Sequence, residues 1–184
     1  MKEIRHLCLL LIVVGTFSVV SSGQEVPTPV AKVVEDLECK MQKSMPDWTR
    51  EPVEPILKSE RVLISVWMNC GRRVKVSINY LQSEAEAIEG IRRFATQVGV
   101  KRIEGLGDEA YAWGYSDAIG MRKGNLVFSI STVALPSLPG VAEGESSVIR
   151  RAEEVALNKG FARIISNILS NPNIKCGELF ERFR

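Results

Sequence analysis

Two strand-like runs joined by a short turn constrain the fold more than any other part of this sequence. In residues 73–80 polar and apolar side chains alternate strictly, and residues 62–69 form a second, mostly apolar run. A period of two is typical of a strand with one buried face and one face in water. Because only Asn69-Cys70-Gly71 separates the two runs, the sequence predicts an antiparallel hairpin.

Three helices are indicated by apolar residues at helical spacing, over residues 30–45, 83–98 and 147–170. Ser83 and Glu86 begin the second of these segments and form the pattern of a capping box. In that motif each side chain accepts a hydrogen bond from the backbone N–H of the other residue. We therefore expect the second helix to begin at Ser83.

More strands are expected at residues 110–115, 118–122 and 125–133, where turn residues separate short apolar runs. The order is then helix, two strands, helix, three strands, helix. This order predicts the α+β class, with a single antiparallel β-sheet and helices packed on it. Residues 24–184 are within the usual size of one domain, so we expect a single domain after a leader at residues 1–23.

The N-terminal 23 residues have the three-part organisation of a secretory signal peptide. A charged start precedes an apolar run over residues 7–20, and small residues follow. The run is shorter than the roughly 20 apolar residues that a membrane-spanning helix needs. We therefore expect cleavage near Ser22 or Gly23 and a secreted or periplasmic protein. The alternative is an uncleaved anchor, and contact with a membrane is expected only in that case.

Cleavage would also remove charged residues and a histidine from the chain. Of the 24 basic and 22 acidic residues, two basic and one acidic lie in the leader, so the remaining net charge is too small to attract nucleic acid. His6 is the only histidine. Its removal excludes nucleophiles activated by histidine and histidine metal sites. The sequence therefore predicts a protein that is not an enzyme, with no cofactor, no metal site and no nucleic-acid partner.

Asp108 and Glu109 are the carboxylates with the strongest claim to a catalytic role, in the segment Gly105-Leu106-Gly107-Asp108-Glu109-Ala110. Adjacent residues of an extended chain point to opposite faces, which is a poor geometry for a facing acid–base pair. One Asp-Glu pair also supplies too few oxygens for calcium, which takes roughly six to eight. We interpret the segment as a structural turn in which the glycines provide backbone freedom.

Three cysteines remain after cleavage, and an oxidising compartment favours one disulfide. Cys39 lies on the side of its predicted helix opposite the apolar stripe, so we expect it to have a covalent partner. The first candidate is Cys39–Cys70, because Cys70 lies in the predicted hairpin turn. Cys39–Cys176 is the alternative, and three free thiols are the third possibility. The leftover cysteine allows either a monomer or a cysteine-linked dimer.

Aromatic side chains mark the candidate ligand-binding residues. Tyr111, Trp113 and Tyr115 occupy alternate positions of one predicted strand, and Trp67 belongs to another. An exposed aromatic row of this kind binds a glycan, a peptide or an apolar ligand. The alternative is an aromatic face packed beneath a helix, with the small residues around Gly114 allowing close approach on the other side.

Two segments of the sequence resemble a known signature. Residues 105–111 (GLGDEAY) and 120–131 (GMRKGNLVFSIS) are similar to those of small exported bacterial proteins and lipoproteins of unknown function. Those proteins resemble the PsbP-like α/β/α sandwich, so the resemblance implies that fold and an exported bacterial setting, but no activity. The chain departs from the lipoproteins because it has no cysteine at the signal junction and has Cys176.

The function that these observations predict is that of an exported binding or accessory module without catalytic activity. Its partner would be an unknown protein or a small ligand. The alternative is a structural or assembly factor at the cell envelope, and an enzyme that depends on carboxylates ranks third. A fold of this kind does not by itself define a function.

Overall fold

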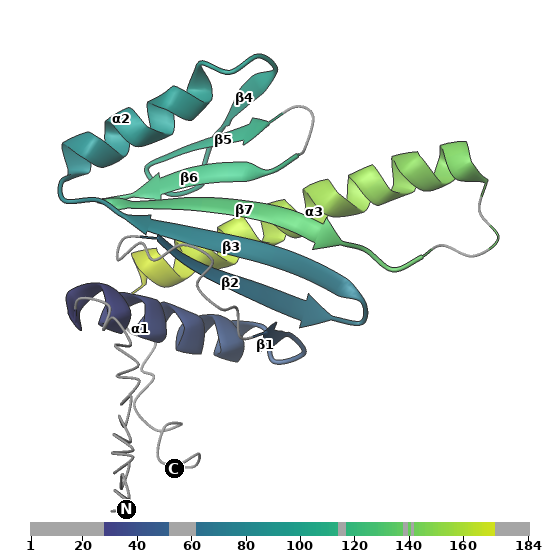
Figure 1. Ribbon diagram of the computed structural model, residues 1–184, viewed down its shortest axis with the longest axis horizontal. Helices are drawn as coiled ribbons and strands as arrows, with labels where there is room; N and C mark the ends of the chain where they lie inside the picture. The colour runs from purple at the N-terminus through teal and green to yellow at the C-terminus, as the bar shows by residue number, and fades with distance from the viewer. Residues whose placement is uncertain (1–27, 52–61, 114–116, 138–139, 141, 172–184) are drawn as a thin grey trace, which may run out of the picture.

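A seven-stranded antiparallel sheet is the centre of the protein (Figure 1). The structure is a computed structural model that describes residues 28–51, 62–113, 117–137, 140 and 142–171. The strand order is β1-β2-β3-β7-β6-β5-β4, and all neighbours are antiparallel. The strands are β1 (Thr49–Glu51), β2 (Val62–Asn69), β3 (Arg72–Tyr80), β4 (Val100–Ile103), β5 (Glu109–Trp113), β6 (Ile119–Lys123) and β7 (Leu126–Ala134).

Helices cover both faces of this sheet. α1 (Thr28–Ser44) and α3 (Glu143–Ser170) pack on one face and contact each other, whereas α2 (Glu84–Ala95) lies on the other face over β4 to β7 (Figure 1). The predicted α+β class, with one antiparallel sheet and helices packed on it, is confirmed. Within the described residues, no helix combines the length and apolarity needed to cross a membrane.

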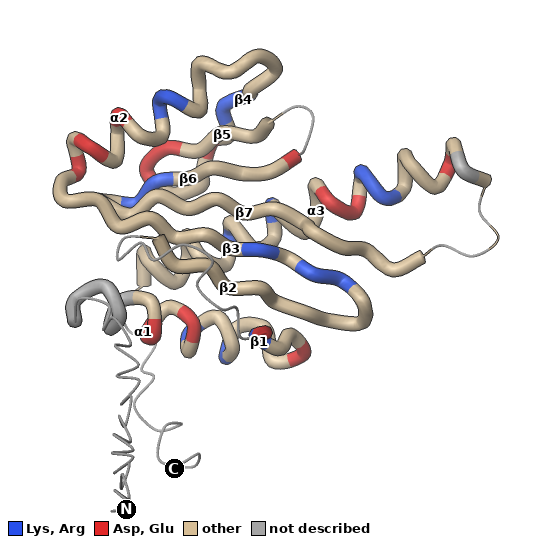
Figure 2. Tube along the Cα trace, viewed as in Figure 1, with Lys and Arg blue, Asp and Glu red and all other residues tan. Residues whose placement is uncertain are grey.

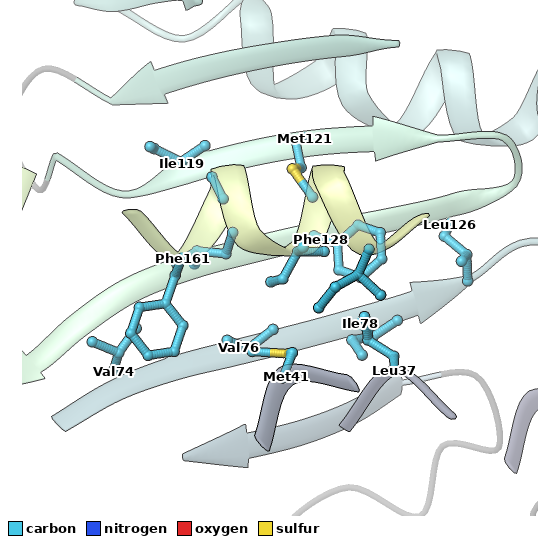
Figure 3. Packing of buried hydrophobic residues seen from close by; sticks show 14 of the residues in the cluster. Leu37, Met41, Val74, Val76, Ile78, Ile119, Met121, Leu126, Phe128 and Phe161 are labelled. Atoms are coloured by element: carbon cyan, nitrogen blue, oxygen red, sulfur yellow. The ribbon is translucent and has the colours of Figure 1, made fainter. Parts of the chain in front are cut away.

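The main hydrophobic core lies between the sheet and the pair α1 and α3 (Figure 3). Alternation along β3 directs every second side chain into this core, as the sequence predicts. Residues of α1, α3, β6 and β7 complete it. The labelled members in Figure 3 are Leu37, Met41, Val74, Val76, Ile78, Ile119, Met121, Leu126, Phe128 and Phe161.

A smaller apolar cluster lies beneath α2. Ala87 and Ile91 of the helix contact Val127 of β7, and Tyr111 of β5 packs against them. Ser83 caps the helix, because its Oγ accepts a hydrogen bond from the Glu86 N–H at 3.2 Å. The Glu86 carboxylate accepts from the N–H of Gln82, at 3.0 Å, rather than from that of Ser83. The capping box is therefore formed with its second bond shifted by one residue.

Local patterns predict most of the strands but miss both edges of the sheet. The hairpin of β2 and β3 forms as expected, with Asn69 opposite Arg72 across the turn. β1 and β4, however, lie in segments for which no strand is predicted. They have only three and four residues, too few for an alternating pattern to be recognised. α3 also begins at Glu143, before the predicted start at Ser147.

Candidate functional site

The aromatic residues of β5 face α2 and are held by specific contacts. The rings of Trp113 and Phe94 meet edge to face, with centroids 5.0 Å apart. Trp113 Nε1 donates a hydrogen bond to Gln97 Oε1 at 2.6 Å. Gly120 of β6 makes room for the indole, since a Cβ at this position would lie 3.0 Å from the Trp113 ring. Trp113 is half-buried, so part of its ring reaches solvent in a fixed orientation.

Tyr111 is the second aromatic residue on this face. Its hydroxyl donates to Glu109 Oε1 at 2.6 Å. This hydrogen bond and partial burial raise the pKa of Tyr111, while the positive charges of Arg102 and Arg92 act in the opposite direction. Arg102 is directly opposite Tyr111 on β4, and Arg92 follows the buried Ile91 on α2. The site therefore combines two half-buried aromatic rings with two guanidinium groups.

The structure brings together only part of the predicted aromatic site. Trp67 pairs with Val74 and lies in the main core, on the opposite face of the sheet, with 1% of its surface exposed. Its Nε1 donates to Ser65 Oγ at 3.2 Å. Grouping Trp67 with the β5 aromatics is therefore wrong, because the sheet separates them. Tyr115 lies outside the described residues.

Sequence reasoning missed the residues that surround the β5 aromatics. Arg92 and Phe94 come from the last turn of α2, and Gln97 comes from the turn that follows it. Arg102 comes from the undetected strand β4. The helical phase could have placed Phe94 on the inner side of α2, since it follows Ile91 by three residues. Nothing local indicates Arg102, because its position depends on the pairing of β4 with β5.

The two motifs of the resemblance pair along β5 and β6, and they also meet at the turns beside these strands. The turn before β5 packs against the turn between β6 and β7, where the Asp108 carboxylate accepts three hydrogen bonds. They come from Lys123 Nζ at 2.8 Å, the Gly124 N–H at 2.8 Å and Arg122 Nη1 at 3.3 Å. Burial by itself raises the pKa of Asp108, but these bonds and charges outweigh it and hold the pKa below its ordinary value. We call this contact the Asp108 clasp.

Three further hydrogen bonds surround the Asp108 clasp, and those to Glu84 and Ser166 join it to α2 and α3. The buried Arg122 also donates to Glu84 Oε1 of α2, at 2.9 Å, and to the Gly124 carbonyl oxygen at 3.0 Å. The Gly107 N–H donates to Ser166 Oγ of α3 at 2.9 Å. Asp108 therefore binds a neighbouring hairpin, not its own backbone as a simple turn would. Because the Glu109 side chain is directed to Tyr111 instead, the two carboxylates have separate structural partners.

The cysteines correct the predicted disulfide. Cys70 is a free, exposed thiol, so the Cys39–Cys70 pairing is wrong. Cys70 occupies a left-handed position in the tight β2–β3 turn, with φ 45°, and there its side chain is open to solvent. Cys39 is half-buried on α1 and is not free. Cys176, the alternative partner, lies outside the described residues.

In the part of the chain that the structure describes, no group of three or more His, Cys, Asp or Glu residues could hold a metal ion. Comparisons with protein-family models, with curated proteins and with solved structures give no match.

Proposed function

We propose that this chain is an exported accessory module that binds a partner protein or a small ligand without transforming it. The binding surface is the half-buried pair Tyr111 and Trp113 with the neighbouring ends of α2 and β4. The observation that carries the proposal is the fixed orientation of both aromatic side chains. Each combines apolar packing against α2 with a hydrogen bond at its polar end. Fixed, partly exposed aromatic rings bind ligands at little cost in side-chain entropy.

Intrinsic fluorescence tests this proposal, because one of the three tryptophans lies at the surface in question. The mature protein is screened against defined sets of acidic, basic and neutral peptides and against oligosaccharides. We expect at least one set to change the tryptophan emission, and the change to disappear in Trp113→Phe. Trp48→Phe is the matched control, because Trp48 packs on Phe161 on the α1–α3 side. Its variant should retain the full change.

Two outcomes of the screen would contradict the proposed surface. In the first, no set of ligands alters the emission of the mature protein. In the second, the change persists in Trp113→Phe and is lost in Trp48→Phe, which places binding on the α1–α3 side. Thermal unfolding of both variants should resemble that of the parent protein, because phenylalanine keeps most of the aromatic packing.

We also propose that export is accompanied by a Cys39–Cys176 disulfide. Cys70 is free, Cys39 is not free, and Cys8 belongs to the proposed leader. The test is an intact mass and a non-reducing peptide map of protein exported from a bacterial host. We expect an N-terminus near residue 23 or 24, one cross-linked pair joining Cys39 to Cys176, and a Cys70 that alkylates without reduction.

The same peptide map separates this proposal from its alternatives. Cys70→Ser should leave the cross-linked pair intact, whereas Cys176→Ser should make Cys39 reactive. Retention of residues 1–23 would contradict cleavage, and alkylation of Cys39 in the unreduced protein would contradict the disulfide. A Cys70–Cys70 link between two copies would instead favour the structural or assembly role, to which the exposed Cys70 thiol is suited.

A further inference from the structure

The two edge strands of the sheet differ in whether their charged residues form ion pairs within the fold. At one end, the charged residues of β1 are paired within the fold, Arg50 with Glu38 at 2.8 Å and Glu51 with Arg73. At the other end, β4 has β5 on one side and no strand on the other among the described residues. An edge strand without a neighbour presents unpaired backbone N–H and C=O groups.

Basic side chains surround the open edge of β4. Lys101 and Arg102 are both exposed, and they point to opposite faces of the strand. Arg92 of α2 lies on the same side as Arg102, since both act on the Tyr111 hydroxyl. Figure 2 shows basic residues on β4 and on α2. Over the described part of the chain, none of these three side chains has an ion-pair partner.

The acidic groups near β4 reduce the positive charge of this edge without cancelling it. Glu89 pairs with Arg93 at 2.6 Å, whereas Glu109 accepts a hydrogen bond from the neutral Tyr111 hydroxyl and keeps its negative charge. Glu104 is exposed just after β4 and has no ion pair within the described residues. Arg92, Lys101 and Arg102 therefore outnumber the carboxylates of Glu104 and Glu109 by one charge, and the edge keeps a small positive surplus.

An exposed apolar side chain lies next to this charge. Val98 is 86% exposed and is located in the turn between α2 and β4. Among the described residues it is the most exposed of the large apolar side chains. A partner that extends along β4 would therefore meet apolar surface as well as positive charge.

We propose that β4 binds an extended acidic peptide segment of a partner protein, which adds to the sheet as an eighth strand. Main-chain hydrogen bonds to an open edge supply affinity in this mode of recognition, and alternate side chains supply specificity. Carboxylates at alternate positions of the peptide would lie on one face of the added strand, where they would contact Arg102 and Arg92. The same charges disfavour pairing with a second copy of this chain, because like charges would meet. The inference rests on the proposed binding function and specifies the partner's chemistry.

Fluorescence anisotropy with a defined probe tests this mode of binding. The probe is a labelled peptide of sequence Glu-Val-Glu-Val-Glu, added to the mature protein. We expect binding that weakens with salt. Arg102→Glu should weaken it by about tenfold or more, because a peptide carboxylate would then meet a like charge. Arg163→Glu is the matched control, since Arg163 is an exposed arginine of α3, and it should bind as the parent does.

Two further peptides separate strand addition from simple charge attraction. A version with N-methylated backbone amides keeps its charges but cannot pair as a strand, and it should lose binding. The Lys-Val-Lys-Val-Lys peptide should not bind. Equal binding of the N-methylated or the lysine peptide overturns the proposal, as does unchanged binding in Arg102→Glu. Arg102→Gln removes the positive charge without adding a negative one, and it should also weaken binding of the acidic peptide. An unaltered melting temperature of this variant shows that the loss of binding reflects the charge and not unfolding.

A sulfated oligosaccharide probe distinguishes this inference from the proposed function. If a heparin hexasaccharide binds with a Trp113-dependent change in emission and the acidic peptide does not bind, the strand-addition proposal falls and the binding function stands. If neither probe binds and the ligand screen is also negative, both proposals fall. If the acidic peptide competes with a ligand that changes the Trp113 emission, the result supports both the binding function and strand addition.

Discussion

Replacing Gly107 with alanine is expected to lower the free energy of unfolding by about 3 kcal/mol or more. Gly107 has φ 56°, a left-handed conformation that alanine adopts only with strain. A Cβ at this position would also lie 2.3 Å from the Arg122 carbonyl oxygen. That oxygen accepts the Asp108 N–H at 2.8 Å. Relief of the clash must therefore move the backbone of the Asp108 clasp.

Gly105 is the matched control for this substitution. It also has a positive φ, 75°, but a Cβ there would meet nothing within 4 Å. Gly105→Ala should therefore cost only about 1 kcal/mol, the cost of the backbone conformation alone. Urea denaturation of the two variants and the parent measures both effects. Equal losses for Gly105→Ala and Gly107→Ala would mean that the contact with Arg122 contributes nothing.

Replacing Asp108 with alanine is expected to cost about 2–4 kcal/mol at pH 7. The substitution removes the acceptor of three hydrogen bonds, from Arg122, Lys123 and the Gly124 N–H. Arg122 is the most serious loss, because its side chain is buried and its Nε already has no hydrogen-bond partner among the described residues. Of the carboxylates that the structure describes, Glu84 then remains as its only partner.

The contribution of Asp108 should also depend on pH in a defined direction. Its pKa is lower in the folded protein than in the unfolded chain, so the ionised form is favoured by folding. The stabilisation is fully present above about pH 4 and is lost as the pH falls through the lower, folded value. Denaturation curves of the parent and Asp108→Ala at pH 7 and at about pH 2 should therefore converge at the lower pH. A stability difference that does not change with pH would contradict this account.

Glu89→Ala provides the comparison for an exposed ion pair. Glu89 pairs with Arg93 on the outer surface of α2, and both side chains are mostly in solvent. Water and salt screen such a pair, so its removal should leave the urea midpoint unchanged. A large shift of the urea midpoint in Glu89→Ala, together with a small shift in Asp108→Ala, would contradict the conclusion that the Asp108 clasp stabilises the fold.

Local patterns predicted the parts of this fold that local interactions determine. The β2–β3 hairpin follows from alternation and a short turn, and the start of α2 follows from the spacing of Ser83 and Glu86. Neither requires knowledge of distant residues. β4 shows the limit of this reasoning, because a strand of four residues with Lys101 and Arg102 at its centre has no buried alternation to detect.

The candidate site depended on information that a linear pattern does not contain. Alternation predicts that Trp67 and Tyr111 each point to one face of a sheet, but not whether the faces are the same. The strand order and register determine that they are opposite. The Asp108 clasp has the same origin, since it requires the turn before β5 to meet the turn after β6. Cys70 was misassigned because proximity in a predicted turn does not specify the direction of a side chain.

The strand order also has a consequence for the folding pathway. β1 to β3 form one meander and β4 to β7 form another, and within each meander every strand pairs with its neighbour in sequence. Only the pairing of β3 with β7 joins segments that are far apart in the chain, such as Val74 and Thr132. The entropy of closing a long loop within the sheet is therefore incurred at one junction. Two locally formed halves can assemble first, and a single docking event between central strands then completes the sheet.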